Sequence, residues 1–214
     1  KYSQLLFILS GGGVFYSDAM DELGNFAIKH NIPVTQTVMG YSTMKRDHSH
    51  FVGPIGGLGG KAANNLAKET DLAICIGTKL ADFTTGSWAN FENPEFKLVS
   101  LNIARHDANK HLAEAVIGDA KVTLTELSNA IGDWKSSDSW HKKSQVELKS
   151  WNEYVDKESG PTNQELPSYA HAVGAIYRNS DPTDIAVTAA GGLVGEVVQV
   201  WRPKELNTHE TEWG

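Results

Sequence analysis

A glycine-rich stretch between residues 53 and 65 has the composition of a phosphate-binding loop but not its spacing. A Walker A loop needs a glycine five residues before the glycine of its Gly-Lys pair, and a hydroxyl residue directly after the pair. Here the pair is Gly60 and Lys61, and the two required positions hold Ile55 and Ala62. The stretch lacks the hydroxyl that holds Mg²⁺ in that motif, so it does not predict a P-loop enzyme.

A second glycine cluster follows an apolar run near the start of the chain, as a dinucleotide-binding fingerprint would. It consists of Gly11, Gly12 and Gly13, and the third glycine of the fingerprint would fall on Tyr16. The chain therefore has two glycine-lined crossings from strand to helix, and neither carries a standard nucleotide signature.

We nevertheless expect a nucleotide crevice where these loops approach one another. Ligands of open parallel sheets bind outside the carboxyl ends of the strands, and glycines let backbone N–H groups reach a phosphate. The expected crevice residues are Gly11, Gly12, Gly13, Gly57, Gly59, Gly77, Thr78 and Lys79, with the lysine as the cation. For Gly11, Gly12 and Gly13 the alternative is that they form only a tight connection from strand to helix, with no ligand bound.

Other residues that could do chemistry give weaker patterns. His48 and His50 are separated by one residue, but no third metal ligand is placed beside them, and we interpret them as part of a solvated loop. Cys75 lies in an apolar run, which predicts a buried strand residue and not a nucleophile. We assign no catalytic residue and no metal ligand in this chain.

Composition excludes several classes of partner. The chain has 214 residues, of which 40% are hydrophobic and 21% charged, with a net charge of −7 and one cysteine. No basic block is long enough to track nucleic acid, and the apolar run at residues 5–9 is too short for a signal peptide or a membrane span. We expect a cytoplasmic protein that binds neither nucleic acid nor membrane. Its six tryptophans all lie from Trp88 onward, and we expect them to pack against other domains or a second subunit.

Apolar runs alternate with helical patterns over residues 3–131. Strands are expected at 5–9, 34–38, 72–76, 97–101 and 115–117, and helices from a Ser17 cap to Asn31, at 61–70 and at 122–131. This alternation predicts an α/β fold with right-handed crossovers: a Rossmann-like parallel sheet with helices on both faces.

The pattern changes near residue 133, which suggests three parts. Residues 1–132 form the first domain, and residues 133–167 form a polar linker with one helix that leans on a neighbour. Residues 168–214 begin a second α/β unit, with a helix capped by Ser168, a strand at 185–187 and a short helix ending at Trp201. A single strand and helix cannot close a core, so we expect this unit to belong to a longer protein.

Four segments of the first part resemble the thiamine diphosphate (ThDP) enzymes of the acetolactate synthase type. They are residues 32–40, 52–59, 71–77 and 116–119, in the same order and spacing. The resemblance covers residues 3–131 and implies the middle domain of such an enzyme. The tail from residue 188 to 203 resembles the start of the diphosphate-binding domain, and this places Gly191, Gly192 and Leu193 at the ThDP diphosphate. Residues 208–214 are most similar to the trihydroxycyclohexanedione hydrolases of the family.

The resemblance implies a ThDP- and Mg²⁺-dependent hydrolase as the full-length protein. Its substrate would be a polyhydroxy cyclic 1,2-diketone, trihydroxycyclohexanedione, opened by C–C cleavage to 5-deoxyglucuronate in inositol catabolism, by a dimer or tetramer. The activating glutamate would precede Lys1 and the Mg²⁺ segment would follow Gly214, so we expect the chain alone to be inactive. The alternatives are an acetolactate synthase-like carboligase or decarboxylase, or a nucleotide-binding or structural module.

Flavin-binding members of the family hold FAD along these glycine loops, but several of their residues are replaced here. Residues 57–59 replace a Met-His-Gly segment, and Phe83 replaces an arginine. Asn102 and Ala104 take the place of an acidic pair, so an adenosine ribose loses its carboxylate partner. We expect weak binding of phosphate or ADP at most, and no tightly held FAD.

Overall fold

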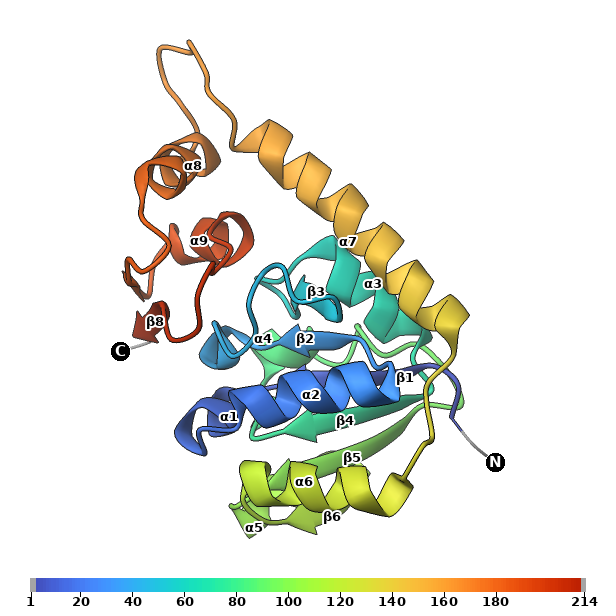
Figure 1. Cartoon of the computed structure of the whole chain (residues 1–214). Coiled ribbons are helices and arrows are strands. Elements are labelled where there is room, and N and C mark those ends of the chain that lie inside the picture. Colours follow the sequence, from blue (N-terminus) through green and yellow to red (C-terminus); the bar gives the residue numbers. More distant parts are fainter. Residues whose placement is uncertain (1–2, 213–214) are drawn as a thin grey trace.

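The computed structural model describes residues 3–212 and is built around a six-stranded parallel sheet (Figure 1). Its strands are β1 (Leu6–Ser10), β2 (Val34–Gln36), β3 (Phe51–Pro54), β4 (Leu72–Ile76), β5 (Lys97–Asn102) and β6 (Glu114–Ile117). They lie in the order β3-β2-β1-β4-β5-β6, and every neighbouring pair is parallel. The order reverses between β1 and β4, which is the switch point where doubly wound sheets bind ligands.

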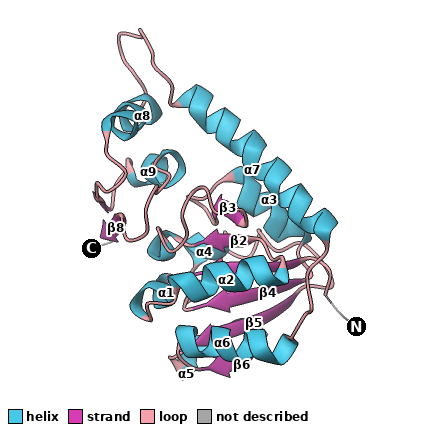
Figure 2. Ribbon diagram, viewed as in Figure 1, coloured by secondary structure: helices cyan, strands magenta, loops and turns pink. Residues whose placement is uncertain are grey.

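Helices cover both faces of this sheet, as the alternation predicts (Figure 2). One face carries α1 (Gly12–Tyr16), α2 (Met20–His30) and α6 (Ala120–Ile131), and the other carries α3 (Lys61–Glu69) and α7 (Asp138–Glu158). The short segments η1 (Val38–Gly40), α4 (Asp82–Thr85), α5 (Arg105–Ala108) and η2 (Lys110–Leu112) lie in the connections. Strand β1 shows why two layers form: Ile8 packs in the α2 and α6 core, while Phe7 packs in the α3 and α7 core.

The first helix after β1 begins and ends differently from the prediction. Ser17 does not cap a long helix; it ends α1, and α2 begins only at Met20. Between them Asp18 has a left-handed backbone conformation, with φ of 49°. The end of α2 is as expected, because Asn31 adopts the left-handed conformation that closes a helix.

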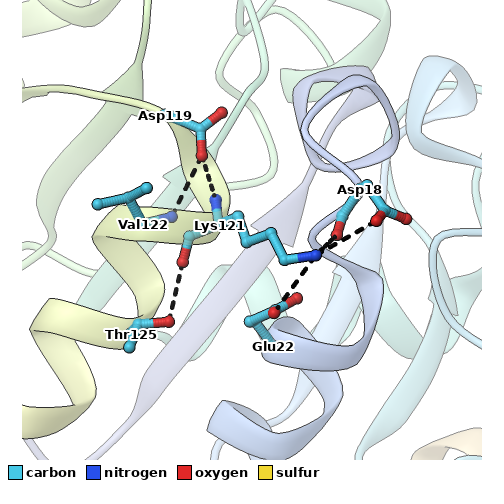
Figure 3. A network of polar contacts seen from close by, with 6 residues as sticks. All are labelled: Asp18, Glu22, Asp119, Lys121, Val122 and Thr125. Atoms are coloured by element: carbon cyan, nitrogen blue, oxygen red, sulfur yellow. Dashed lines mark hydrogen bonds and ion pairs between the residues drawn. The ribbon is translucent and has the colours of Figure 1, made fainter.

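A polar network from α6 fixes this turn (Figure 3). The Lys121 ammonium donates to the backbone carbonyl of Asp18 at 2.9 Å and lies 3.6 Å from a carboxylate oxygen of Glu22. Asp119 in turn caps α6, because its carboxylate accepts the N–H groups of Lys121 at 2.9 Å and Val122 at 3.2 Å. The network joins two helices that lie about one hundred residues apart in the sequence.

Strand β3 was not predicted, because glycine and proline interrupt its apolar pattern. Gly53 has a positive φ of 87°, and Pro54 has no N–H for a ladder hydrogen bond. Both are tolerated because β3 is an edge strand that pairs only with β2.

Helix α7 occupies most of the segment expected to be a linker, and it is anchored in the core of the first part. Trp140 is 2% exposed and packs in the same core as Phe7 and Leu66. Its indole N–H donates to the Leu6 carbonyl at 2.9 Å. The expectation that the tryptophans pack outside the chain is therefore wrong for Trp140, and also for Trp201, which is 8% exposed. Trp213 lies outside the described residues.

The C-terminal segment contains α8 (Tyr169–Asn179), β7 (Ala186–Ala189), α9 (Val194–Val200) and β8 (His209–Glu212). Ser168 caps α8 as predicted, with its hydroxyl accepting the His171 N–H at 3.3 Å. Strands β7 and β8 pair in parallel as a separate two-stranded sheet, and β8 was not predicted. Among residues 3–212, no helix is both long enough and apolar enough to cross a membrane.

This C-terminal segment docks on the first part through the loop after β2. Tyr41 is 5% exposed, and its hydroxyl donates to the Trp201 carbonyl at 2.8 Å and also contacts that of Val198. The Arg46 N–H donates to the Pro203 carbonyl at 3.0 Å. The two parts are therefore held by buried hydrogen bonds as well as by apolar packing.

Candidate functional site

The loops at the switch point meet, but they pack directly on each other. The Gly11 N–H donates to the Ile76 carbonyl at 2.8 Å, and the Gly13 N–H donates to the Gly77 carbonyl at 2.9 Å. A Cβ on Gly13 would lie 2.5 Å from the Gly77 Cα, and one on Gly12 would lie 2.9 Å from the Met39 carbonyl oxygen. The backbones of these loops lie so close together that any side chain at Gly12 or Gly13 would clash, and this packing alone explains the glycines without a ligand.

Asn102 fixes the neighbouring loop, which sequence reasoning did not anticipate. Its side chain is nearly buried, donates to the Thr78 carbonyl at 3.2 Å and accepts the Ala104 N–H at 3.0 Å. The available signal was an asparagine at the carboxyl end of a strand, where its side chain commonly bonds the backbone two residues on. Here that asparagine links the loops that follow β4 and β5.

Lys79, the expected cation of the crevice, is exposed and its charge acts on Asp107. The Lys110 ammonium, 2.6 Å from the Asp107 carboxylate, holds the pKa of that carboxyl below its usual range, and Lys79 adds a smaller electrostatic contribution.

The second glycine loop folds on itself and on α4. The Gly57 N–H donates to the Phe83 carbonyl at 2.7 Å, and the Gly59 N–H donates to the Gly56 carbonyl at 3.0 Å. Leu58, between them, packs against the apolar cluster of Tyr41 and its neighbours from α9. At Gly11, Gly13, Gly57 and Gly59, the backbone donors that a phosphate would use are engaged within the chain. Nucleotide binding at these loops stays a prediction.

The loop after β7 has the opposite character, because its backbone is open. Gly191 has a φ of 147°, and no atom lies within 4 Å of a Cβ placed on it. At Gly192 the nearest atom is a ring carbon of Tyr169 at 4.0 Å, and the Leu193 side chain is half-exposed. A diphosphate can approach this backbone without displacing any side chain. Gly191, Gly192 and Leu193 therefore fit the diphosphate of ThDP, for which the sequence makes them candidates.

The expectation that the histidine pair lies in a solvated loop is wrong for His50, whereas His48 is partly exposed. The His50 side chain is 6% exposed, and its ring stacks on His141 of α7 with centroids 4.2 Å apart. Burial lowers the pKa of His50 to about 4, and the nearby His141 and His48 add to this shift. Within residues 3–212, no three histidine, cysteine or acidic side chains are grouped to hold a metal ion.

Cys75 lies in β4 and is fully buried, as predicted. Burial raises the pKa of its thiol far above the ordinary value, so the thiolate that a nucleophile requires does not form at neutral pH.

Strand order and loop placement define a doubly wound α/β domain with a second α/β segment docked on it. Residues 1–127 match the family described as "Thiamine pyrophosphate enzyme, central domain", and the chain belongs to this family.

Three curated relatives are each named 3D-(3,5/4)-trihydroxycyclohexane-1,2-dione hydrolase. The chain is 32% identical over 230 residues to that of Clostridium perfringens (strain 13 / Type A), and 34% identical over 235 residues to that of Bacillus anthracis (strain CDC 684 / NRRL 3495). It is 31% identical over 230 residues to that of Geobacillus thermodenitrificans (strain NG80-2). Each similarity covers 97% of this chain but only 35–36% of the relative, so the chain spans about a third of their length.

Proposed function

We propose that this chain is part of a ThDP- and Mg²⁺-dependent hydrolase that opens trihydroxycyclohexanedione, a cyclic 1,2-diketone, to 5-deoxyglucuronate in inositol catabolism. The observation that carries the proposal is the extent of the similarity. It covers 97% of the chain and so continues past residue 127, where the family match ends, into the segment that contains Gly191 and Gly192. A cytoplasmic location and self-association as a dimer or tetramer are part of the same proposal.

In this proposal, bound ThDP supplies the group that stabilises the carbanion formed when the C–C bond breaks. The role of the chain's own residues is to hold and orient. Gly191, Gly192 and Leu193 offer an open backbone to the diphosphate, and the docking of α9 against Tyr41 keeps that loop in position. The first domain, residues 1–132, acts as the spacer, and residues 133–167 carry α7 between it and the second unit.

The test is a ring-opening assay of the full-length protein at graded ThDP concentrations. Gly191→Ala places a side chain in a conformation that suits only glycine, and such backbone strain costs about 1–3 kcal/mol. Since 1.4 kcal/mol corresponds to a factor of ten, we expect the ThDP concentration that the variant requires to rise about tenfold. Gly132→Ala is the matched control, because Gly132 also has a positive φ and an open surrounding but ends α6 instead.

Three outcomes would count against this function. The first is that the full-length protein forms acetolactate from pyruvate and leaves the diketone intact. The second is that Gly191→Ala has the same ThDP dependence as the control, and the third is that residues 1–214 alone open the ring with ThDP and Mg²⁺. The first of these would favour the carboligase alternative.

The glycine loops favour a structural role for the first domain over nucleotide binding. Their backbone N–H groups donate to carbonyls of the same chain. Asn102, which donates to the Thr78 carbonyl, stands where a carboxylate side chain would be needed to bind the ribose. We expect calorimetric titration of the 214-residue chain to give weak ADP binding at most. Stoichiometric FAD binding at submicromolar affinity would contradict this.

A further inference from the structure

A polar cavity lies where α3, α7 and α9 converge, and no residue of the Gly191 loop lines it. Its volume is about 730 Å³, and its walls come from all three helices. This is within the range of ~300–1,000 Å³ that small-molecule sites occupy. Neither the family match nor the names of the relatives assign anything to it.

An aromatic wall on α7 lines the cavity. The rings of Trp151 and Tyr154 are nearly parallel, with centroids 5.4 Å apart and an interplanar angle of 29°. Gly60 makes this placement possible, because a Cβ there would lie 2.6 Å from the indole nitrogen of Trp151. Tyr154 is 54% exposed, so a large aromatic surface remains open to a ligand.

Polar side chains face the same space: Glu147 from α7 itself, Lys61 and Asn65 from α3, and Gln199 from α9. Glu147 is held by the Asn65 amide, which donates to one carboxylate oxygen at 2.9 Å. Within the described part of the chain, neither the Lys61 ammonium nor the Gln199 amide has a hydrogen-bond or ion-pair partner. The cavity thus combines an aromatic wall with a carboxylate, a cation and an amide that can donate and accept.

We propose that this cavity binds a neutral polyhydroxylated six-membered ring, such as a cyclitol or a pyranose. The C–H face of such a ring suits the aromatic wall, and its hydroxyls suit side chains that both donate and accept hydrogen bonds. The lining carries one positive charge, on Lys61, and one negative charge, on Glu147, so the cavity has no net charge that would favour an anionic or a cationic ring over a neutral one.

An occupant of this cavity bridges the two parts of the chain. Lys61 begins α3 of the first part, whereas Gln199 lies on α9, which directly follows the Gly191 loop. The bound ring therefore stabilises the docking of α9, and this holds whether or not the proposed hydrolase activity is correct.

The test is calorimetric titration of the 214-residue chain with myo-inositol and, separately, with glucose. We expect saturable binding of at least one probe, and the two arms show whether the cyclitol or the pyranose is preferred. Tyr154→Ala and Gln199→Ala should each weaken binding about fivefold to tenfold, the change expected when one stacking or hydrogen-bonding contact is lost.

Two exposed residues outside the cavity provide matched controls. Tyr16→Ala and Gln164→Ala remove the same side-chain types elsewhere, and we expect unchanged affinity in both. Circular dichroism of all four variants verifies that they fold. The proposal is overturned if neither probe binds saturably to the wild-type chain, or if folded Tyr154→Ala and Gln199→Ala bind as tightly as the controls.

Discussion

At the scale of single residues, His209 is buried without the partners that a polar ring requires. It is 6% exposed, and both ring nitrogens are buried with no hydrogen-bond partner among the described residues. Its ring lies 4.5 Å from that of Tyr41, and burial lowers its pKa to about 4. The folded protein therefore keeps His209 neutral at pH values where an unfolded chain, with a histidine pKa of ~6.5, binds a proton.

The sign of the pH dependence follows from this difference. Below pH 6.5 the unfolded state binds more protons than the folded state, so stability falls as pH falls until the folded pKa near 4 is reached. The contribution of one such histidine is up to ~1.4 kcal/mol per pH unit. His50, which is also buried and has a pKa of about 4, changes stability in the same direction.

We predict that His209→Phe stabilises the protein by about 1 kcal/mol at neutral pH, because it removes unpaired buried nitrogens and keeps a ring beside Tyr41. It should also lose about 2 kcal/mol less than wild type between pH 7 and pH 5. Urea unfolding at the two pH values measures both effects. His106→Asn, at an exposed histidine, should keep the wild-type pH dependence. An unchanged slope in His209→Phe would show that its burial does not determine the acid sensitivity.

At the scale of elements, α7 is held to the sheet chiefly by Trp140. Its indole fills the core beside Leu66 of α3, and its N–H satisfies the Leu6 carbonyl. Other contacts of α7 with the first part are less deeply buried: His141 stacks on His50, Trp151 lies against Gly60, and Lys143 forms an exposed ion pair with Glu69 at 2.5 Å. Exposed ion pairs contribute little, and among the large side chains of α7 that contact the first part the indole of Trp140 is the most deeply buried, at 2% exposed, so we expect it to contribute most.

We expect Trp140→Ala to lower the free energy of unfolding by about 3–5 kcal/mol, because it leaves a large cavity. Trp140→Phe should cost about 1–3 kcal/mol, since the Leu6 carbonyl loses a buried donor. Val146→Ala, on the solvent side of the same helix, is the control and should change stability by less than about 0.5 kcal/mol. Chemical denaturation measures all three. Equal stability of Trp140→Ala and the control would contradict this anchoring role.

The comparison of elements shows what the sequence can and cannot predict. The parallel sheet follows from apolar runs such as β4, and helix ends follow from local signals such as Ser168 and Asn31. Strand β3 was missed because its pairing with β2, and not its own composition, makes it a strand. The stacking of His50 on His141 was missed because contacts between residues about ninety apart leave no local pattern. For the candidate site, the sequence located the glycine loops but not their mutual packing, which depends on distances between backbones.

At the scale of the whole molecule, the connection between α7 and α8 is a loop that projects from the rest of the chain (Figure 1). Residues 161–168 are almost all exposed and lie between two helices. The contacts that hold the two parts together lie outside this loop, and involve Tyr41, Arg46, the cluster around Val198 and the packing of Val155 on α8 and α9. The chain can therefore be cut in this connection without breaking the contacts that hold the parts together.

We predict that limited proteolysis cuts first between residues 160 and 168 and spares α7, and that the two fragments then elute together in size-exclusion chromatography. In Tyr41→Phe the carbonyls of Val198 and Trp201 lose their donor, so the cut fragments should dissociate more readily than those of the wild type. Tyr154→Phe removes a hydroxyl that makes no hydrogen bond among the described residues, and should leave them associated. Early cleavage within α7, or separation of the wild-type fragments, would contradict this arrangement.

Helix α7 can also be considered as a lever. Its 21 residues span about 30 Å, and Trp140 is buried near one end while Val155 contacts the C-terminal segment near the other. A tilt of about 5° at the indole would move the far end by roughly 2–3 Å over that length. Displacements of that size are large compared with the ~1 Å misplacement that can slow an enzyme a hundredfold. How tightly one tryptophan is packed thus determines how accurately this helix sets the spacing between the two parts of the protein.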